Sequence, residues 1–345
     1  MNQIVFTLNA DSVLIDRLRG LEPEDVFVLV DENSREHCLN RFRETKFKDE
    51  NIIAIESGEQ HKSIETVIHI WSVLTAAGAK RNSVLVNIGG GLVTDMGGFA
   101  AACFKRGIRC INMPTTLLAQ VDASVGGKTG INFGHLKNEI GTFSVPECVI
   151  IDNCFLRSLS QRQLLSGFAE MLKHGLLCGE RELHHLFRVD FSNVDQPEFL
   201  QLIKDSVEVK KRIVEADPTE KGIRKALNFG HTVGHAVESV AIDKHMEVFH
   251  GDAVAYGMIA ELYLSVKRLG FDAEIYQQVK ALIRKLYPPY VQVASAEDLY
   301  ELMLHDKKND RKGVNFTLLR HPGEFVVDNY CNREEIAEAL KELTD

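Results

Sequence analysis

Hydrophobic positions in the first part of the chain alternate between strand-like runs and helical spacing. Residues 26–30 form a continuous apolar run (Val-Phe-Val-Leu-Val), which is typical of a strand buried on both faces of a parallel sheet. Ser63 can cap a helix whose apolar residues recur at helical spacing. Residues 83–88 form a second apolar run that leads directly into three glycines at 89–91. A strand, a helix, a strand and a glycine turn at this spacing predict a doubly wound α/β fold.

The pattern changes in the second part of the chain. Helical periodicity dominates from residue 161 to residue 304, and only residues 316–319 and 325–327 resemble late strands. We therefore predict two domains: a Rossmann-like α/β domain over residues 1–151 and a mostly α-helical domain over residues 152–345.

Composition and charge narrow the class of protein. The 345 residues are 45% hydrophobic and 26% charged, as in ordinary soluble domains. A net charge of −9 gives no basic footprint, which argues against nucleic acid as the main partner. No apolar stretch approaches bilayer length, and the N-terminus has no signal-peptide pattern, so no membrane partner is expected. Seven scattered cysteines without a C-x-x-C pair are typical of reduced thiols in the cytoplasm.

Two glycine-rich segments are candidates for binding phosphate. The run from Gly89 to Gly98 follows a strand and opens a helix, where backbone N–H groups can approach an anion. It is not the G-x-G-x-x-G fingerprint, so cofactor binding and a merely tight turn both stay open. Residues 125–129 resemble the end of a Walker loop, but Asp122 stands where that loop needs a glycine, which excludes an NTPase. Lys128 could contact a phosphate or a carboxylate, or lie in solvent.

Histidines supply the most specific pattern. His231 and His235 are one helical turn apart, His250 follows, and Glu170 lies upstream. Thr232 replaces the glutamate of the H-E-x-x-H motif, so a metalloprotease would lack its base. A bare pair could simply lie on a helix surface. Small residues in the same turns favour close approach of another element, and hence a metal site with an open coordination position.

Together these motifs resemble the 3-dehydroquinate synthase family over essentially the whole chain. Eight segments match in the family's order, which makes chance similarity implausible. They are residues 57–62, 89–95, 114–122, 126–128, 137–138, 167–173, 227–238 and 250–251.

The resemblance implies an enzyme with NAD, a Zn2+ or Co2+ ion, and a homodimer. The metal ligands it implies are Glu170, His231 and His250. The NAD contacts it implies are Asp31, Glu59, Gln60, Lys62, Gly89, Gly90, Gly91, Asp95, Thr115, Thr116, Lys128, Lys137, Phe155, Ser158 and Leu159. The substrate and catalytic residues it implies are Arg106, Asp122, Lys128, Asn138, Lys173, Lys210, Glu220, Arg224, Asn228, His235 and one lysine of the 307–308 pair, taken as Lys307.

The implied substrate is an anionic sugar acid phosphate, 3-deoxy-D-arabino-heptulosonate 7-phosphate. In the implied reaction, NAD removes a hydride, phosphate leaves by β-elimination, the hydride returns, the ring opens, and an intramolecular aldol closes the carbocycle. Three alternatives remain from the sequence: a cyclase making valiolone-type or inosose-type rings, a metal-dependent polyol dehydrogenase that releases NADH, and a metal-stabilised binding module. The last leaves the lysines and glycine turns unexplained.

Overall fold

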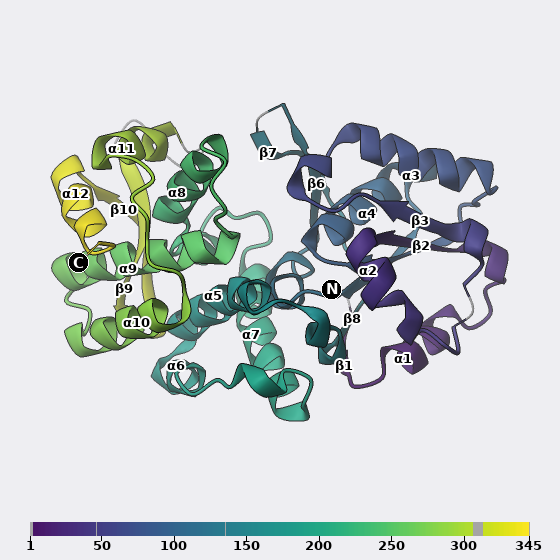
Figure 1. The fold of residues 1–345 in the computed structure, drawn as a ribbon, viewed down its shortest axis with the longest axis horizontal. Coiled ribbons are helices and arrows are strands. Elements are labelled where there is room, and N and C mark those ends of the chain that lie inside the picture. The colour runs from purple at the N-terminus through teal and green to yellow at the C-terminus, as the bar shows by residue number, and fades with distance from the viewer. Residues whose placement is uncertain (1–2, 46, 135, 306–312, 345) are drawn as a thin grey trace. The chain divides into compact units, whose positions relative to one another are not determined.

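The chain folds into two compact units. The structure, a computed structural model, describes residues 3–45, 47–134, 136–305 and 313–344. The first unit comprises Met1–Ser160 and Phe191–Val207, and the second comprises Gln161–Asp190 and Glu208–Asp345. Among the described helices, none is both long and apolar enough to cross a bilayer. Figure 1 shows the sheet of the first unit and the helices of the second.

A six-stranded sheet in the order β1-β8-β5-β4-β2-β3 forms the centre of the first unit, and all its described pairings are parallel. Four α-helices and an antiparallel hairpin of β6 and β7 accompany it. The strands are β1 (Gln3–Thr7), β2 (Val26–Asp31), β3 (Ile52–Ile55), β4 (Val84–Gly89), β5 (Arg109–Pro114), β6 (Lys128–Phe133), β7 (Leu136–Phe143) and β8 (Cys148–Asp152). The helices are α1 (Ala10–Leu18), α2 (Glu32–His37), α3 (Ile64–Ala76) and α4 (Gly91–Cys103).

Both faces of this sheet are buried. Phe27 and Leu29 of β2 belong to an apolar cluster that includes residues of α3 and α4. Val28 and Val30, which point to the opposite face, belong to a second cluster that includes Leu14 of α1. Burial on both faces explains the continuous apolar runs in the sequence. The predicted doubly wound α/β fold is confirmed.

Local signals in the sequence account for the ends of several elements of the first unit. The Ser63 side chain accepts a hydrogen bond from the backbone of Thr66 and caps α3, as predicted. Strand β4 ends at Gly89, and α4 begins at Gly91. The chain reverses its direction of sheet building between β2 and β4, so the carboxyl ends of these two strands form a topological switch point. Ligands of open α/β sheets bind at such points.

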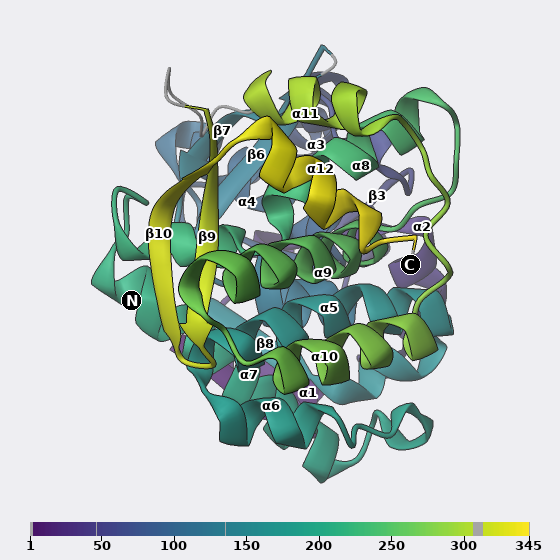
Figure 2. The ribbon, with the colours of Figure 1, turned by 90° about the vertical axis from the view of Figure 1, so that its left-hand side faces the viewer.

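The second unit is mostly helical, as predicted. Figure 2 faces this unit and shows α9 in its middle, with α5, α8, α10 and α12 around it and the β9–β10 hairpin at one side. Helix α7 (Pro197–Ala216) contributes residues to both units. The other helices are α5 (Gln161–Cys178), α6 (Glu180–Leu186), α8 (His231–Asp243), α9 (His250–Leu269), α10 (Ala273–Leu286), α11 (Ala296–His305) and α12 (Arg333–Lys341), and the late strands are β9 (Val314–His321) and β10 (Glu324–Cys331).

Glycines let α9 approach its two neighbours at backbone distance. A Cβ atom on Gly257 would lie 1.9 Å from the carbonyl oxygen of Gly230, at the start of α8. A Cβ atom on Gly251 would lie 2.3 Å from the Cα atom of Ser166 in α5. Real Cβ atoms do not come this close to backbone atoms, so both positions require glycine. The first residues of α8 and α9 are therefore brought together beside α5.

Candidate active site

Three helices of the second unit bring the predicted metal ligands together. His231 and His250 are the first residues of α8 and α9, and Glu170 lies in α5. The Oε1 atom of Glu170 lies 3.4 Å from Nε2 of His231 and 3.7 Å from Nε2 of His250. Tetrahedral zinc with ligands at about 2.1 Å keeps two ligand atoms about 3.4 Å apart. The spacing of these three side chains therefore fits a zinc-type ion.

The other ring nitrogen of each histidine also has a neighbour. Nδ1 of His231 lies 3.2 Å from the carbonyl oxygen of Phe229, and Nδ1 of His250 lies 3.5 Å from Oε2 of Glu238. Contacts of this kind orient metal-binding histidines and leave Nε2 for the metal. Sequence analysis missed Glu238, although its position on the turn after His235 was a usable signal.

Burial and charge make this cluster attractive to a cation. Glu170 is fully buried, and its oxygens face the Lys173 ammonium group and the two histidine rings. Burial would raise the pKa of Glu170, but the positive charges of Lys173 and the neighbouring histidines outweigh it and hold the pKa well below its usual range. Burial would lower the pKa of His250, but Glu170 and Glu238 outweigh it and raise the pKa to about 10, so a metal ion that binds this ring must displace a proton. A buried, charged carboxylate whose Oε1 atom faces the Nε2 atoms of two histidines is what a metal ligand requires, so these residues fit a divalent cation.

Two further predicted residues lie beside the cluster. Lys173 is 1% exposed, pairs with Glu170, and donates a hydrogen bond to the carbonyl oxygen of Leu227 at 2.9 Å. The ring centroids of His235 and His231 are 5.1 Å apart, and those of His235 and His250 are 6.2 Å apart. His235 thus lies close enough to the cluster to contact a ligand of the same ion.

Other predicted substrate residues of the second unit lie on α7 and in the segment before α8. The Nδ2 atom of Asn228 donates a hydrogen bond to Oε1 of Glu220 at 3.2 Å. Arg224 is buried, and its Nη1 atom donates to the carbonyl oxygen of Pro218 at 2.8 Å. Lys210 is also buried, whereas a run of three basic residues ordinarily forms the solvated face of a helix. Lys307 lies outside the described residues.

In the first unit, backbone groups and small side chains collect at the carboxyl ends of β2, β4 and β5. Asp31 ends β2 and caps α2, its Oδ1 atom accepting from the backbone of Ser34 at 2.7 Å. Gly89, Gly90 and Gly91 join β4 to α4, and Thr115 donates its backbone N–H to the carbonyl oxygen of Gly89 at 2.9 Å. A Cβ atom on Gly90 would lie 3.1 Å from Cγ2 of Thr116. Open backbone before a helix N-terminus suits a dinucleotide phosphate.

A second group in the first unit centres on Lys62, whose side chain is 5% exposed. Its Nζ atom lies 2.7 Å from Oδ2 of Asp95 and 2.6 Å from Oδ1 of Asn138. Burial raises the pKa of Asp95, and the charge of Lys62 offsets only part of that effect. Asn132, which sequence analysis missed, donates to Oε1 of Glu59 at 2.9 Å and accepts the backbone N–H of Asn138 at 2.9 Å. Predicted NAD and substrate residues thus share one hydrogen-bonded group.

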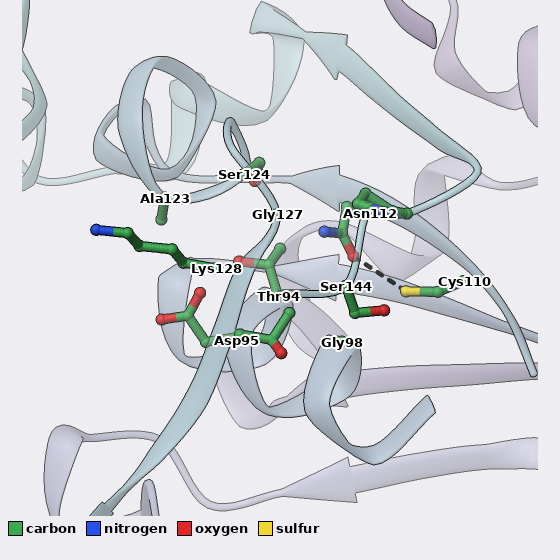
Figure 3. Close-up of a pocket in the computed structure, with 12 residues that line it drawn as sticks. Thr94, Asp95, Gly98, Cys110, Asn112, Ala123, Ser124, Gly127, Lys128 and Ser144 are labelled. Atoms are coloured by element: carbon green, nitrogen blue, oxygen red, sulfur yellow. Dashed lines mark hydrogen bonds between the residues drawn. The ribbon is translucent and has the colours of Figure 1, made fainter. Parts of the chain in front are cut away.

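A pocket beside this group is lined in part by Asp95, Ser124 and Lys128. Figure 3 shows the side chains of Lys128 and Asp95 extending toward the same side of it. Asp122 lies nearby in a short π-helical turn, Ala119–Ala123. The pocket therefore presents one cationic and one anionic side chain from residues that the sequence singled out.

The remaining predicted residues are more dispersed. Arg106 and Lys137 are exposed, and Arg106 has a left-handed φ of 65°. The Phe155 ring is 1% exposed and stacks on Phe42, with ring centroids 6.2 Å apart, so that side chain belongs to the core. The others lie in loops or short turns of the first unit and are Gln60, Ser158 and Leu159.

Comparison with known proteins gives the family. Residues 52–166 match the sequence model of the 3-dehydroquinate synthase N-terminal family, and residues 167–309 match that of the C-terminal family. The chain belongs to the 3-dehydroquinate synthase family. A 3-dehydroquinate synthase from Parabacteroides distasonis is 47% identical over 340 residues, which are 98% of this chain and 96% of the relative. One from Campylobacter jejuni subsp. doylei is 37% identical over 343 residues, 97% of each chain.

A solved structure extends the comparison to ligands. A 2-epi-5-epi-valiolone synthase from Streptomyces hygroscopicus subsp. jinggangensis, with NAD+ and Zn2+ bound, superposes with a TM-score of 0.87 at 27% identity. The alignment covers 99% of this chain and 96% of that one. The predicted resemblance to the 3-dehydroquinate synthase family is confirmed, and the cofactors expected of that family, NAD and a divalent metal, match those bound in this neighbour.

Proposed function

We propose that this chain is a 3-dehydroquinate synthase, a lyase that converts 3-deoxy-D-arabino-heptulosonate 7-phosphate to 3-dehydroquinate and phosphate. The observation that carries the proposal is the group formed by Glu170, His231 and His250, which has the geometry and charge of an open metal site. Membership of the family and the motifs shared with it support the same substrate.

In this proposal the three ligands hold a Zn2+ or Co2+ ion, and the glycine turn at 89–91 holds the phosphates of NAD. The bound ion supplies a Lewis acid that acidifies a substrate hydroxyl group. Bound NAD+ accepts a hydride and later gives it back, so the overall conversion has no net oxidation.

The protein's own residues bind the substrate and handle its protons. Arginine and lysine side chains hold the two anionic ends of the substrate, because charge-assisted hydrogen bonds are strong and directional. His235 holds or moves a proton next to the metal ligands, and Glu220 orients Asn228. The substrate contacts proposed are Arg106, Asp122, Lys128, Asn138, Lys173, Lys210, Arg224, Asn228, His235 and Lys307.

The proposed active form is a homodimer. The β6–β7 hairpin of the first unit exposes large apolar side chains, among them Phe133 at 61% and Phe143 at 69%. Exposed apolar groups of this size are typical of protein interfaces. Replacing both phenylalanines by serine should shift the mass in sedimentation velocity from dimer to monomer, whereas Val291→Ser, at a site 62% exposed in the second unit, should not. A wild-type protein that sediments as a monomer would contradict the proposed dimer.

We place the enzyme in the cytoplasm, because its seven scattered cysteines favour a reducing compartment.

The direct test is a substrate assay with NAD+ and Zn2+. The purified protein should release phosphate from the heptulosonate phosphate in step with formation of the carbocycle, without accumulation of NADH. A sugar phosphate that lacks the carboxylate should react poorly. Preference for that second substrate would favour another cyclase, and steady NADH production from a simple polyol would favour a dehydrogenase.

A further inference from the structure

A buried carboxylate in α9 lies against the start of the helix that carries His231. Glu261 is 0% exposed. Its two oxygens accept hydrogen bonds from three backbone N–H groups: Gly230 at 2.7 Å, Thr232 at 3.1 Å and Val233 at 3.3 Å. All three groups belong to the N-terminal end of α8.

The hydrogen bonds to Glu261 replace those that an N-cap side chain accepts in most helices. The first N–H groups of a helix have no partner within the helix, and a side chain at the N-cap usually accepts from them. In α8 the N-cap is Gly230, which offers no side chain. Glu261 supplies the missing acceptor from the neighbouring helix, and its negative charge complements the positive end of the helix dipole.

The same contacts fix the backbone on either side of His231. Gly230 precedes this histidine and Thr232 follows it, and both are bound by one carboxylate. The position of the His231 Nε2 atom relative to Glu170 therefore depends on where Glu261 holds the start of α8. Hydrogen bonds that orient metal ligands commonly change metal affinity when they are removed.

We propose that Glu261 is a positioning residue for the metal site: it acts through the backbone of α8 to hold His231 in the geometry that binds the ion. This inference rests on the proposed function, since it assumes that Glu170, His231 and His250 are the ligands. Glu261 is proposed to act through the backbone on either side of His231, not as a ligand of the ion.

Zinc affinity of the folded, metal-free protein tests this role, measured by competition with a chromophoric chelator. Glu261→Gln keeps the shape of the side chain but turns an N–H donor toward the backbone donors, so zinc affinity should fall about 10- to 100-fold. Glu342→Gln makes the same change at a carboxylate of the second unit that contacts Tyr276 and Lys280 instead. Its zinc affinity should stay within about twofold of wild type, because distant sites act independently.

The variant His231→Ala separates failure of this inference from failure of the proposed function. If His231→Ala loses zinc while Glu261→Gln binds it as tightly as wild type, the positioning role is wrong and the metal site stands. If His231→Ala binds zinc like wild type, the ligand assignment itself is wrong. A role of Glu261 in stability alone would lower the melting temperature without changing the zinc affinity of the folded protein, and that result also rejects positioning.

Hydrogen exchange of the wild-type protein gives a second measurement that needs no variant. If Glu261 links the start of α8 to the metal site, the amides of Gly230, Thr232 and Val233 should be protected without metal and exchange more slowly when zinc is added. Unchanged exchange of these three amides at saturating zinc would overturn the proposal even if Glu261→Gln did not fold.

Discussion

The candidate nucleotide residues and the candidate metal residues are built in different ways. In the first unit, many of the nucleotide residues lie in the loops and turns that follow parallel strands, and they include the backbone of the glycine turn after β4 and exposed side chains such as Glu59. In the second unit, the metal residues come from three packed helices, with Glu170 fully buried and His231 only 12% exposed. One group is assembled from loops on a rigid sheet, and the other is part of a helical core.

This difference predicts that substitutions in the first unit change mainly the affinity for a ligand, whereas substitutions among the metal residues change both ligand affinity and the stability of the fold. A change in a strand-end loop alters what the loop can bind and leaves the sheet below it intact. A change among closely packed helices alters the core and the ligand geometry together, because packed interiors do not deform smoothly. Substitutions in the two units should therefore differ in which measured quantities move.

The largest effect is expected from His231→Ala. Loss of a ligand should remove the Lewis acid, which is worth several kcal/mol to the transition state, and turnover should fall about a thousandfold or more. Circular dichroism of the metal-free variant should match wild type, because removal of the imidazole leaves the backbone hydrogen bonds from the start of α8 to Glu261 in place. The control His185→Ala, at an exposed site in α6, should retain full turnover. Wild-type turnover by His231→Ala would refute the ligand assignment.

The next largest effect is expected from Gly257→Ala, which tests whether helix packing and the metal site are one structure. The added Cβ would lie 1.9 Å from the carbonyl oxygen of Gly230, so α8 and α9 must separate. We expect a loss of about 3 kcal/mol in the free energy of unfolding, with weaker zinc binding. The measurements are urea denaturation and chelator competition.

The control for that variant is Gly20→Ala, at a site with φ +85° and no atom within 4 Å of the added Cβ. It carries only backbone strain, about 1–2 kcal/mol, and should leave zinc affinity unchanged. Equal effects of the two substitutions on both quantities would contradict the view that the metal residues are part of the helical core.

The sequence predicted those elements whose signals lie in residues next to one another in the chain. The apolar runs of β2 and β4, the Ser63 cap and the glycine turn are each set by neighbouring residues, so their pattern predicts them. The His231 helix was predicted in the same way. That Glu170 and His250 meet it depends on the crossing of three helices. The histidine spacing favoured a metal site, and the family resemblance named these three residues as its ligands.

What escaped prediction depends on contacts between distant segments. Residues 191–207 pack with the first unit although they follow helices of the second. The β6–β7 hairpin has few apolar residues in strict alternation. Gly130 and Gly141 also lie opposite each other in its two strands, so its strand pattern is weak. Lys210 and Glu261 resemble ordinary charged positions of amphipathic helices, and only packing shows that they are buried.

A smaller effect, confined to affinity, is expected from Gly90→Ala in the first unit. Its Cβ would lie 3.1 Å from a methyl group of Thr116, a contact that a small side-chain shift can relieve. The methyl group would still crowd the backbone that a dinucleotide phosphate must approach, so NAD+ affinity should fall about tenfold, or 1.4 kcal/mol. Isothermal titration with NAD+ measures this.

Zinc affinity and the urea midpoint of Gly90→Ala should stay close to wild type, and Gly20→Ala again serves as the control with unchanged NAD+ affinity. If Gly90→Ala were as destabilising as Gly257→Ala, the contrast between loops on a sheet and a helical core would be lost.

The smallest effect is expected from Glu342→Gln, at a carboxylate of the second unit that contacts Lys280 and Tyr276. Burial would raise the pKa of Glu342, but these hydrogen bonds outweigh it and lower the pKa. A lowered folded-state pKa adds stability above the unfolded pKa and loses it as the pH falls through the folded value. Because the pair is partly exposed, the difference at pH 7 should be under about 1 kcal/mol. Urea denaturation of wild type and variant should converge as the pH drops below about 4. A difference that grew on acidification would mean that the charged carboxylate of Glu342 destabilises the fold.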